Sequence, residues 1–181
     1  MSSTVLHGLP PLVGPHTRVL ILGSFPGVRS LQQQQYYAHP QNQFWRLLAA
    51  LWPDTVPAGF YDKSASTAHG ISCSSYEIRS KWLLERGLGL WDVYAHCERQ
   101  GSLDSAIRNA TPNDIATLQR SQLPQLQAIA HNGGESFKHA RHTRTLGLPV
   151  YQLPSTSPAN ASWSFERKLE AWREVMRDAW I

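Results

Sequence analysis

Short apolar runs separated by longer amphipathic stretches predict that strands and helices alternate along this chain. The run at 18–23 ends in Gly23 and has the character of a buried strand that stops at a tight turn. Three further runs predict strands at 88–94, 126–130 and 150–153. The hydrophobic pattern therefore predicts four strands, each followed by polar sequence.

The stretches between and after these strands have helical spacing. The helices are predicted at 40–53, 74–87, 111–124, 137–146 and 165–179. Pro40 suits a first helical position, and Ser74 with Glu77 forms a capping-box pattern. The residues from 53 to 73 are rich in Pro, Gly, Ser and Thr without periodicity, which is typical of a long surface connection.

This order of elements predicts an α/β protein of three layers, α/β/α, with a central, mostly parallel sheet of four strands. Parallel neighbours need right-handed crossovers, which place helices on both faces of the sheet. No linker is evident, so residues 1–181 are predicted to form a single domain. In such sheets ligands bind beyond the carboxyl ends of the strands. Small polar turns are expected there, at Gly23–Gly27, Asp92–Val93, His131–Gly134 and Pro154–Asn160.

Composition and charge narrow the class of protein. The 17 Lys and Arg residues outnumber the 13 Asp and Glu residues, and the net charge of +4 favours polyanionic partners mildly. No apolar run approaches the roughly 18 residues of a membrane span and no signal peptide is evident, so a soluble, cytoplasmic protein is expected. Cys73 and Cys97 are too few for an iron–sulfur cluster, and His139 and His142 lack partners at metal-ligand spacing. We predict no metal and no cofactor.

Three sequence blocks carry a resemblance to a known family. GSFPG at 23–27, YYAHPQNQFW at 36–45 and LPSTSPAN at 153–160 resemble, in order and position, the motifs of the uracil-DNA glycosylase superfamily. Phe25 stands where other branches have a catalytic Asn or Asp, and the last block lacks the Leu that they insert into the duplex. Both departures are similar to the hypoxanthine (deoxyinosine) branch, in which the catalytic amide lies in the second block. That residue is Asn42 here.

The resemblance implies a role for Asn42 in holding the water nucleophile. An amide oxygen that accepts from water while the NH2 group donates elsewhere fixes the water in line for attack on the sugar. The alternative is that Asn42 bonds backbone groups at the start of the helix near Pro40. No lysine lies in the matched blocks, so hydrolysis without a Schiff base is expected.

The resemblance also implies a set of residues that bind the base. Tyr37 is expected to stack on the flipped base, or else to be an ordinary buried tyrosine. Ser24 and Phe25 are expected to offer backbone N–H groups to the base, with the Phe25 ring walling the pocket. Asp92 would accept N1–H of hypoxanthine and repel adenine, unless it caps a helix or forms an ion pair.

A third group of residues is expected to contact the DNA backbone. The last block would bind phosphates as the duplex is pinched, through Ser155, Thr156, Ser157, Pro158 and Asn160. Turn formation and capping of the final helix are the alternative roles of these residues. The basic stretch with Lys138, Arg141 and Arg144 would follow phosphates or be a solvated face. His39, His131 and Asn132 are further candidates for the pocket, with a structural role favoured for His39.

The activity implied is excision of deaminated bases from DNA by a monomeric glycosylase that starts base excision repair. Two other functions stay open: a mismatch-specific uracil/thymine DNA glycosylase, and a non-catalytic nucleic-acid-binding relative. The central expectation is spatial, because Asn42 must share one cleft with the turns at Ser24 and Ser157.

Overall fold

The central sheet has four parallel strands, as the hydrophobic pattern predicts. The computed structural model describes residues 4–61 and 74–180, so the predicted connection at 53–73 lies largely outside the described residues. The strands lie side by side in the order β3 (Leu88–Asp92), β2 (Val19–Gly23), β6 (Ala128–Asn132) and β7 (Val150–Leu153). All three pairings are parallel, so every carboxyl end lies at the same edge.

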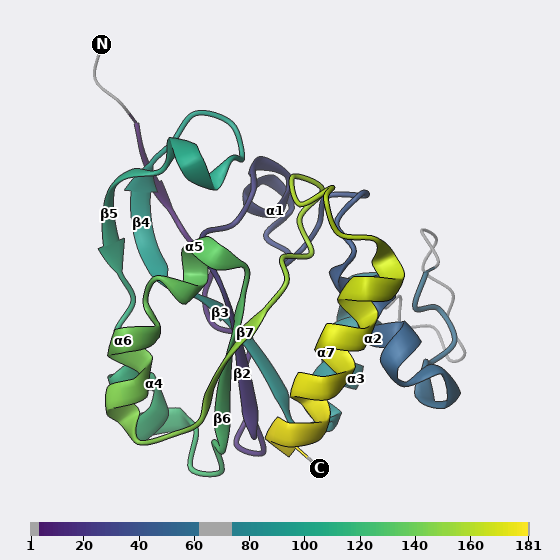
Figure 1. Ribbon diagram of the computed structural model, residues 1–181. Helices are drawn as coiled ribbons and strands as arrows, with labels where there is room; N and C mark the ends of the chain where they lie inside the picture. Colours follow the sequence, from purple (N-terminus) through teal and green to yellow (C-terminus); the bar gives the residue numbers. More distant parts are fainter. Residues whose placement is uncertain (1–3, 62–73, 181) are drawn as a thin grey trace.

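Helices cover both faces of this sheet, which confirms the three-layer prediction (Figure 1). One face is covered by α2 (Phe44–Leu51), α3 (Ser75–Glu85) and α7 (Phe165–Trp180). The other is covered by α4 (Ile115–Gln122), α5 (Gly134–Phe137) and α6 (Ala140–Thr143). Short helices complete the set: α1 (Val28–Gln33), η1 (Pro53–Thr55), η2 (Asp104–Ala106) and η3 (Arg144–Leu146).

Strand β2 shows why the sheet is buried on both faces. Val19 and Ile21 belong to the core under α2, α3 and α7, whereas Leu20 and Leu22 belong to the core on the α4 side. Successive side chains of a strand point to opposite faces, so an uninterrupted apolar run is what a central parallel strand requires. The two cores hold β2 rigidly, and the turn after Gly23 begins from a fixed position.

A second, antiparallel sheet was not predicted from the sequence. It contains β1 (Val5–His7), β4 (Tyr94–Glu98) and β5 (Arg108–Pro112), with β4 in the centre. The apolar run at 88–94 is in fact two strands, because the chain leaves the large sheet after Asp92 and enters the small one at Tyr94. Short strands with an exposed face carry a weak apolar pattern, which explains the omission.

Several predicted helix boundaries were wrong. Thr111 and Pro112 belong to β5, and the cap of α4 is Asp114, whose carboxylate accepts from Thr117 N–H. The helix predicted at 40–53 begins at Phe44 instead of Pro40, so the preceding block forms a turn, and α1 was not predicted. The basic stretch at 137–146 is broken into short helical pieces. Helix α3 keeps its predicted capping box.

Residues 4–61 and 74–180 contain neither a candidate membrane-spanning helix nor a candidate metal site. Within residues 4–61 and 74–180, no helix combines the length and apolar character needed to cross a bilayer. Over the same ranges, no three His, Cys, Asp or Glu side chains gather closely enough to hold a metal ion.

Candidate active site

The carboxyl ends of the parallel strands bring together an amide, two hydroxyls and a carboxyl group. Asn132 ends β6, and its Nδ2 donates to the Tyr37 hydroxyl and to Thr156 Oγ1, each at 3.1 Å. Thr156 N–H donates back to Asn132 Oδ1 at 3.1 Å. Because the buried Asn132 amide uses both ends, its orientation is fixed. Asn132 thereby connects the second sequence block, through Tyr37, with the third, through Thr156.

Tyr37 is held in an unusual backbone conformation. Its φ of 54° lies in the left-handed region, which costs a bulky residue free energy and persists only where the surroundings impose it. Its ring stacks on Phe44 with centroids 3.9 Å apart and planes 18° apart. Burial raises the pKa of its hydroxyl, so Tyr37 is neutral. With one ring face covered by Phe44, a base can stack only on the other.

Asp92 is a buried carboxyl group at the end of β3. The residue is 5% exposed, and Oδ2 has no hydrogen-bond partner among the described residues. Burial first, and then the charge of Asp104, raise the pKa of Asp92 to about 7. A Cβ on Gly23 would lie 2.5 Å from Asp92 Oδ1, so glycine is required beside the carboxyl group. This arrangement leaves a buried acceptor unsatisfied, which is costly for the fold alone.

Asn42 lies in the turn before α2, and its orientation is set by the backbone. Its Oδ1 accepts from Phe44 N–H at 3.0 Å, and its own N–H donates to the His39 carbonyl at 2.9 Å. Within the described residues, Asn42 Nδ2 makes no hydrogen bond. The helix-start role weighed from the sequence is therefore real, yet it leaves the NH2 group and one lone pair of Oδ1 available.

Asn42 and Tyr37 line a cleft of about 680 Å³. Further lining residues include the aromatic Trp45, Tyr61 and Tyr76 and the cations Arg46 and Arg79. The residues that line this cleft do not include Ser24 or Ser157, so the expected single enclosure is not present in this conformation. The cleft and the strand ends meet at Tyr37, whose hydroxyl binds Asn132.

The cleft segment is nevertheless fixed to the last sequence block. Gln43 N–H donates to the Thr156 carbonyl at 3.0 Å, and Gln43 Oε1 accepts from Lys168 Nζ of α7 at 3.0 Å. Asn42 is the residue before Gln43, so its position follows that of the block. The structure thus brings Asn42 and Tyr37 close to Thr156, which lies 114 or more residues further along the chain.

The Gly23–Gly27 turn begins beside Tyr37, whose hydroxyl oxygen lies 3.5 Å from the place that a Cβ on Gly23 would take. Ser24 Oγ donates to Asp104 Oδ1 at 2.6 Å, so its side chain turns toward the small sheet. Phe25 is buried in the core on the α4 side, with the Arg99 guanidinium 5.1 Å from its ring centroid. The Phe25 ring is therefore core packing, and the predicted base contacts at Ser24 and Phe25 stay a prediction about their backbone.

The last block, Pro154–Asn160, braces itself. Ser155 Oγ accepts from Ser157 N–H, and Asn160 Nδ2 donates to the Ser155 carbonyl. Thr156 is buried, and its hydrogen bonds go to Asn132 and Gln43. Pro158 is exposed at the tip. Turn formation accounts for most of these contacts, and contact with DNA phosphates stays a prediction.

The candidate histidines have structural surroundings. His131 is fully buried, its two ring nitrogens bind the Ser136 and Thr143 hydroxyls, and burial lowers its pKa to about 4. The suggestion that His131 lines the pocket was therefore wrong. His39 lines the cleft, and its Nδ1 accepts from Gln41 N–H at 3.1 Å.

A family model and solved structures place this geometry among known proteins. The model described as the uracil DNA glycosylase superfamily matches residues 10–176. A solution NMR structure of a candidate uracil DNA glycosylase from Methanosarcina acetivorans is similar over 97% of this chain and 99% of its own, with 34% identity and a TM-score of 0.76. The chain belongs to the uracil DNA glycosylase superfamily, as its three sequence blocks predict.

Two curated relatives share nearly the whole length of the chain. The hypoxanthine DNA glycosylase of Methanosarcina acetivorans is 33% identical over 173 residues, which cover 96% of this chain and 99% of the relative. The hypoxanthine DNA glycosylase of Methanosarcina barkeri is 31% identical over 170 residues, which cover 94% and 97%. Both relatives carry the name of the branch that the sequence blocks favour.

Sequence reasoning missed two residues of this region. Asn132 was only a possible lining residue, although its place directly after a buried strand is a usable signal. Asp104 gave no signal at all, because it lies between two strands of the unpredicted small sheet. Both residues act through contacts with partners that are remote in sequence.

Proposed function

We propose that this chain is a hypoxanthine DNA glycosylase, which hydrolyses the bond between the sugar and the deaminated base and leaves an abasic site. Membership of the superfamily and the near-full-length likeness to hypoxanthine DNA glycosylases support the activity. The observation that carries the proposal is Asn42, which lines a cleft with its oxygen oriented by Phe44 N–H and with no hydrogen bond from its NH2 group to any described residue. Position 25, where related branches have a catalytic Asn or Asp, is a buried phenylalanine.

The chemistry begins when the damaged nucleotide leaves the base stack, because its sugar carbon is shielded in the duplex. Asn42 Oδ1 accepts one hydrogen of a water molecule on its remaining lone pair and aims the water oxygen at C1′. The new C1′–O bond replaces the bond from C1′ to N9 of hypoxanthine. The electron pair of the broken bond leaves with the base, and the proton released by water finally neutralises it.

Asp92 and Tyr37 are proposed to hold the departing base. Hypoxanthine offers N1–H, which the unpartnered Asp92 Oδ2 can accept when the carboxyl group is ionised. Adenine presents an acceptor at N1 and would leave the carboxylate unpaired, which is a strong basis for rejection. The free face of Tyr37 stacks on the base, an interaction worth about 1–3 kcal/mol.

The backbone of the extruded nucleotide is proposed to lie along the last block. Ser155, Ser157 and Asn160 lie beside the exposed tip at Pro158, where they can donate to phosphates. The turn that braces them also stiffens the loop, which suits a segment that must press on DNA. We propose that one copy of the chain acts on one lesion.

The test compares base release from duplexes that carry inosine, uracil, xanthine or a G·T mismatch, each cleaved with alkali after incubation. We expect inosine to be processed fastest. Faster release of uracil, or of thymine from the mismatch, would assign the chain to the mismatch-specific branch instead. If no duplex were cleaved although lesion DNA was bound, the chain would be a non-catalytic binder.

A further inference from the structure

The connection between β4 and β5, residues 99–107, holds the Gly23–Gly27 turn from outside the parallel sheet. Ser24 Oγ donates to Asp104 Oδ1 at 2.6 Å, and Val28 N–H donates to Ser102 Oγ at 3.0 Å. Arg99 Nη2 donates to the Pro26 carbonyl. Side chains of the connection thus bind Ser24 and Pro26 of the turn and Val28 directly after it, all more than 70 residues away in sequence.

Arg99 is the buried part of this contact. Its residue is 8% exposed, Nε donates to the Gly101 carbonyl at 3.0 Å, and the guanidinium lies 5.1 Å from the Phe25 ring centroid. A buried charge is costly unless its hydrogen bonds are made. Here two carbonyls and an aromatic face receive the guanidinium, while Nη1 has no hydrogen-bond partner among the described residues. A lysine has neither the planar fork nor the stacking surface needed for the same contacts.

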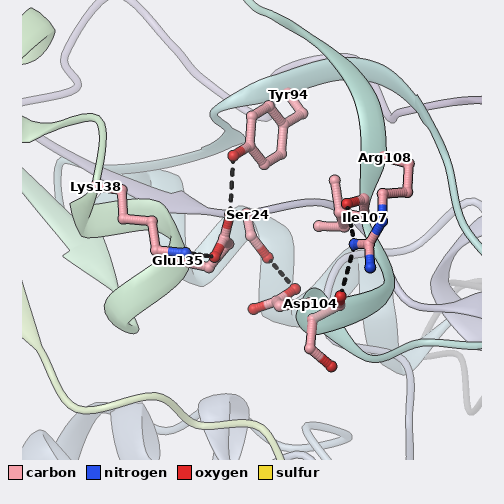
Figure 2. Close-up of polar contacts among 8 residues, drawn as sticks. Ser24, Tyr94, Asp104, Ile107, Arg108, Glu135 and Lys138 are labelled. Atoms are coloured by element: carbon pink, nitrogen blue, oxygen red, sulfur yellow. Dashed lines mark hydrogen bonds and ion pairs between the residues drawn. The ribbon is translucent and has the colours of Figure 1, made fainter.

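Asp104 is the exposed part, and its own support is rigid. It begins η2, and Arg108 Nη1 donates to the carbonyls of Ser105 and Ile107 at 2.8 Å each, which closes the end of η2 onto β5 (Figure 2). Figure 2 also shows Glu135, which accepts a hydrogen bond from Tyr94 and forms an ion pair with Lys138. The Asp104 carboxylate is therefore held in place on the side of the turn that faces the small sheet.

We propose that Arg99 and Asp104 are positioning residues, which hold the Gly23–Gly27 turn in the arrangement that the lesion pocket requires. This inference rests on the proposed function, because it assigns the turn to the pocket wall. The turn has lost the side chain that related branches place at position 25, so its remaining contribution is the placement of its backbone. A displacement of about 1 Å at a reacting site can lower the rate about 100-fold, so a fixed turn matters for the chemical step.

The first experiment measures single-turnover release of hypoxanthine by Asp104→Ala, Asp104→Asn and Ser24→Ala proteins. We expect Asp104→Ala to lower the rate about 10-fold, the loss expected when a hydrogen bond to a charged group is removed. Asp104→Asn should keep most of the activity, because an amide oxygen accepts from the same Ser24 hydroxyl. Ser105→Ala, on the same short helix, is the matched control and should behave as the wild type.

A double-mutant cycle tests whether Ser24 and Asp104 act together. The Ser24→Ala, Asp104→Ala protein should be no slower than the slower single variant, because both remove one interaction. Multiplication of the two losses would contradict the inference, since the residues would then act independently. An Asp104→Asn protein as slow as Asp104→Ala would also overturn it, because the carboxylate would then be needed for chemistry itself.

The second experiment does not depend on activity. Hydrogen exchange should become faster in Arg99→Met and Arg99→Lys proteins at two amides: Val28 N–H, which donates to Ser102 Oγ, and Tyr94 N–H, which donates to the Ser24 carbonyl of the turn. Exchange in β2 and β6 should stay slow. Unchanged exchange at these two amides would overturn the positioning role. If the wild type released no base from any duplex, the proposed function would fail while these exchange rates still decided whether the connection holds the turn.

Discussion

The two sides of the strand ends differ in how they use charge. On the side facing α2 and α7, neutral groups of Tyr37, Asn132 and Thr156 form the hydrogen-bond network, and Asn42 lines the cleft beside Tyr37. The side facing the small sheet and α5 carries Asp104, Glu135 and Lys138, held by Ser24 and Tyr94. Both networks fix the ends of sequence segments that are far apart in the chain, but they do so with different groups.

Burial explains most of this difference. Amides and hydroxyls can satisfy one another without solvent, whereas an unpaired charge in the interior is costly, so the buried network is neutral and the exposed one is ionic. Arg99 and Lys168 are buried charges that donate to oxygen acceptors, whereas Asp92 is a buried carboxyl group whose Oδ2 has no hydrogen-bond partner among the described residues. A buried group that lowers the stability of the fold indicates a residue retained for its function.

The largest effect is expected from the neutral side. Asn42→Ala should lower the rate of hypoxanthine release about 100- to 1,000-fold, the usual loss when a polar group that serves the transition state is removed. Binding of inosine duplex should remain, because Asn42 contributes little of the contact area. Single-turnover kinetics and a binding titration on the same protein preparation measure the two quantities separately.

The hydrogen bond from Phe44 N–H to Asn42 Oδ1 at the start of α2 needs its own control. Asp114→Ala removes the equivalent cap of α4, on the other face of the sheet. Both variants should lower the melting temperature, because each leaves a helix N–H without its acceptor. Only Asn42→Ala should lose activity. Equal loss of activity in the two proteins would show that Asn42 acts through stability alone.

The sequence predicted the parallel sheet well because its central strands are buried on both faces. The run at 19–23 carries an uninterrupted apolar signal that needs no partner to be recognised. The small sheet escaped because β5 is largely exposed and β4 follows β3 after one residue. A single apolar run at 88–94 contains no mark at Val93 where the chain changes sheets.

The candidate site was predictable residue by residue but not as an arrangement. The resemblance indicated Asn42, Tyr37 and Asp92. Asp92 ends β3, the Tyr37 hydroxyl bonds to Asn132 at the end of β6, and Asn42 lines the cleft with Tyr37. Sequence could not show that Ser24 turns toward Asp104, because that contact joins residues 80 positions apart. It also could not show that Thr156 is a buried structural partner of Asn132.

The buried carboxyl group of Asp92 predicts a pH dependence of activity. Asp92 accepts N1–H as a carboxylate, and its pKa of about 7 means that roughly a tenth is ionised at pH 6 and nine tenths at pH 8. Hypoxanthine release should therefore increase about 10-fold between these values. In Asp92→Asn the increase should disappear, since the amide does not titrate. A wild-type profile that was flat between pH 6 and 8 would exclude Asp92 as the acceptor.

The same group predicts the opposite trend in stability. The pKa of Asp92 is raised in the folded chain from an ordinary value near 3.8, so the folded state binds the proton more tightly than the unfolded state. The stabilisation from that proton is complete below pH 3.8 and is lost as the pH rises through about 7. Asp92→Asn should gain stability relative to the wild type between pH 5 and 8 in urea unfolding. A constant difference would contradict the raised pKa.

A smaller effect, on stability, is expected within the neutral side. Asn132→Ala removes three hydrogen bonds and leaves the Tyr37 hydroxyl and the Thr156 N–H without their partner. Loss of about 3 kcal/mol in the free energy of unfolding is expected, because buried groups left unpaired cost about 1–3 kcal/mol each. Asn113→Ala, which removes one side-chain bond to the Asp92 carbonyl, is the control and should cost less.

The smallest effect is expected on the charged side, where it separates two cations of one predicted DNA-binding stretch. Lys138 pairs with Glu135, whereas Arg141 has no carboxylate partner among the described residues. If the stretch follows phosphates, Arg141→Ala should reduce the magnitude of the negative slope of log affinity against log salt by about 0.9. Lys138→Ala should change it less, because Glu135 already balances that charge. Equal changes would mean that the pair opens on DNA, and no change in either would make this face a solvated surface.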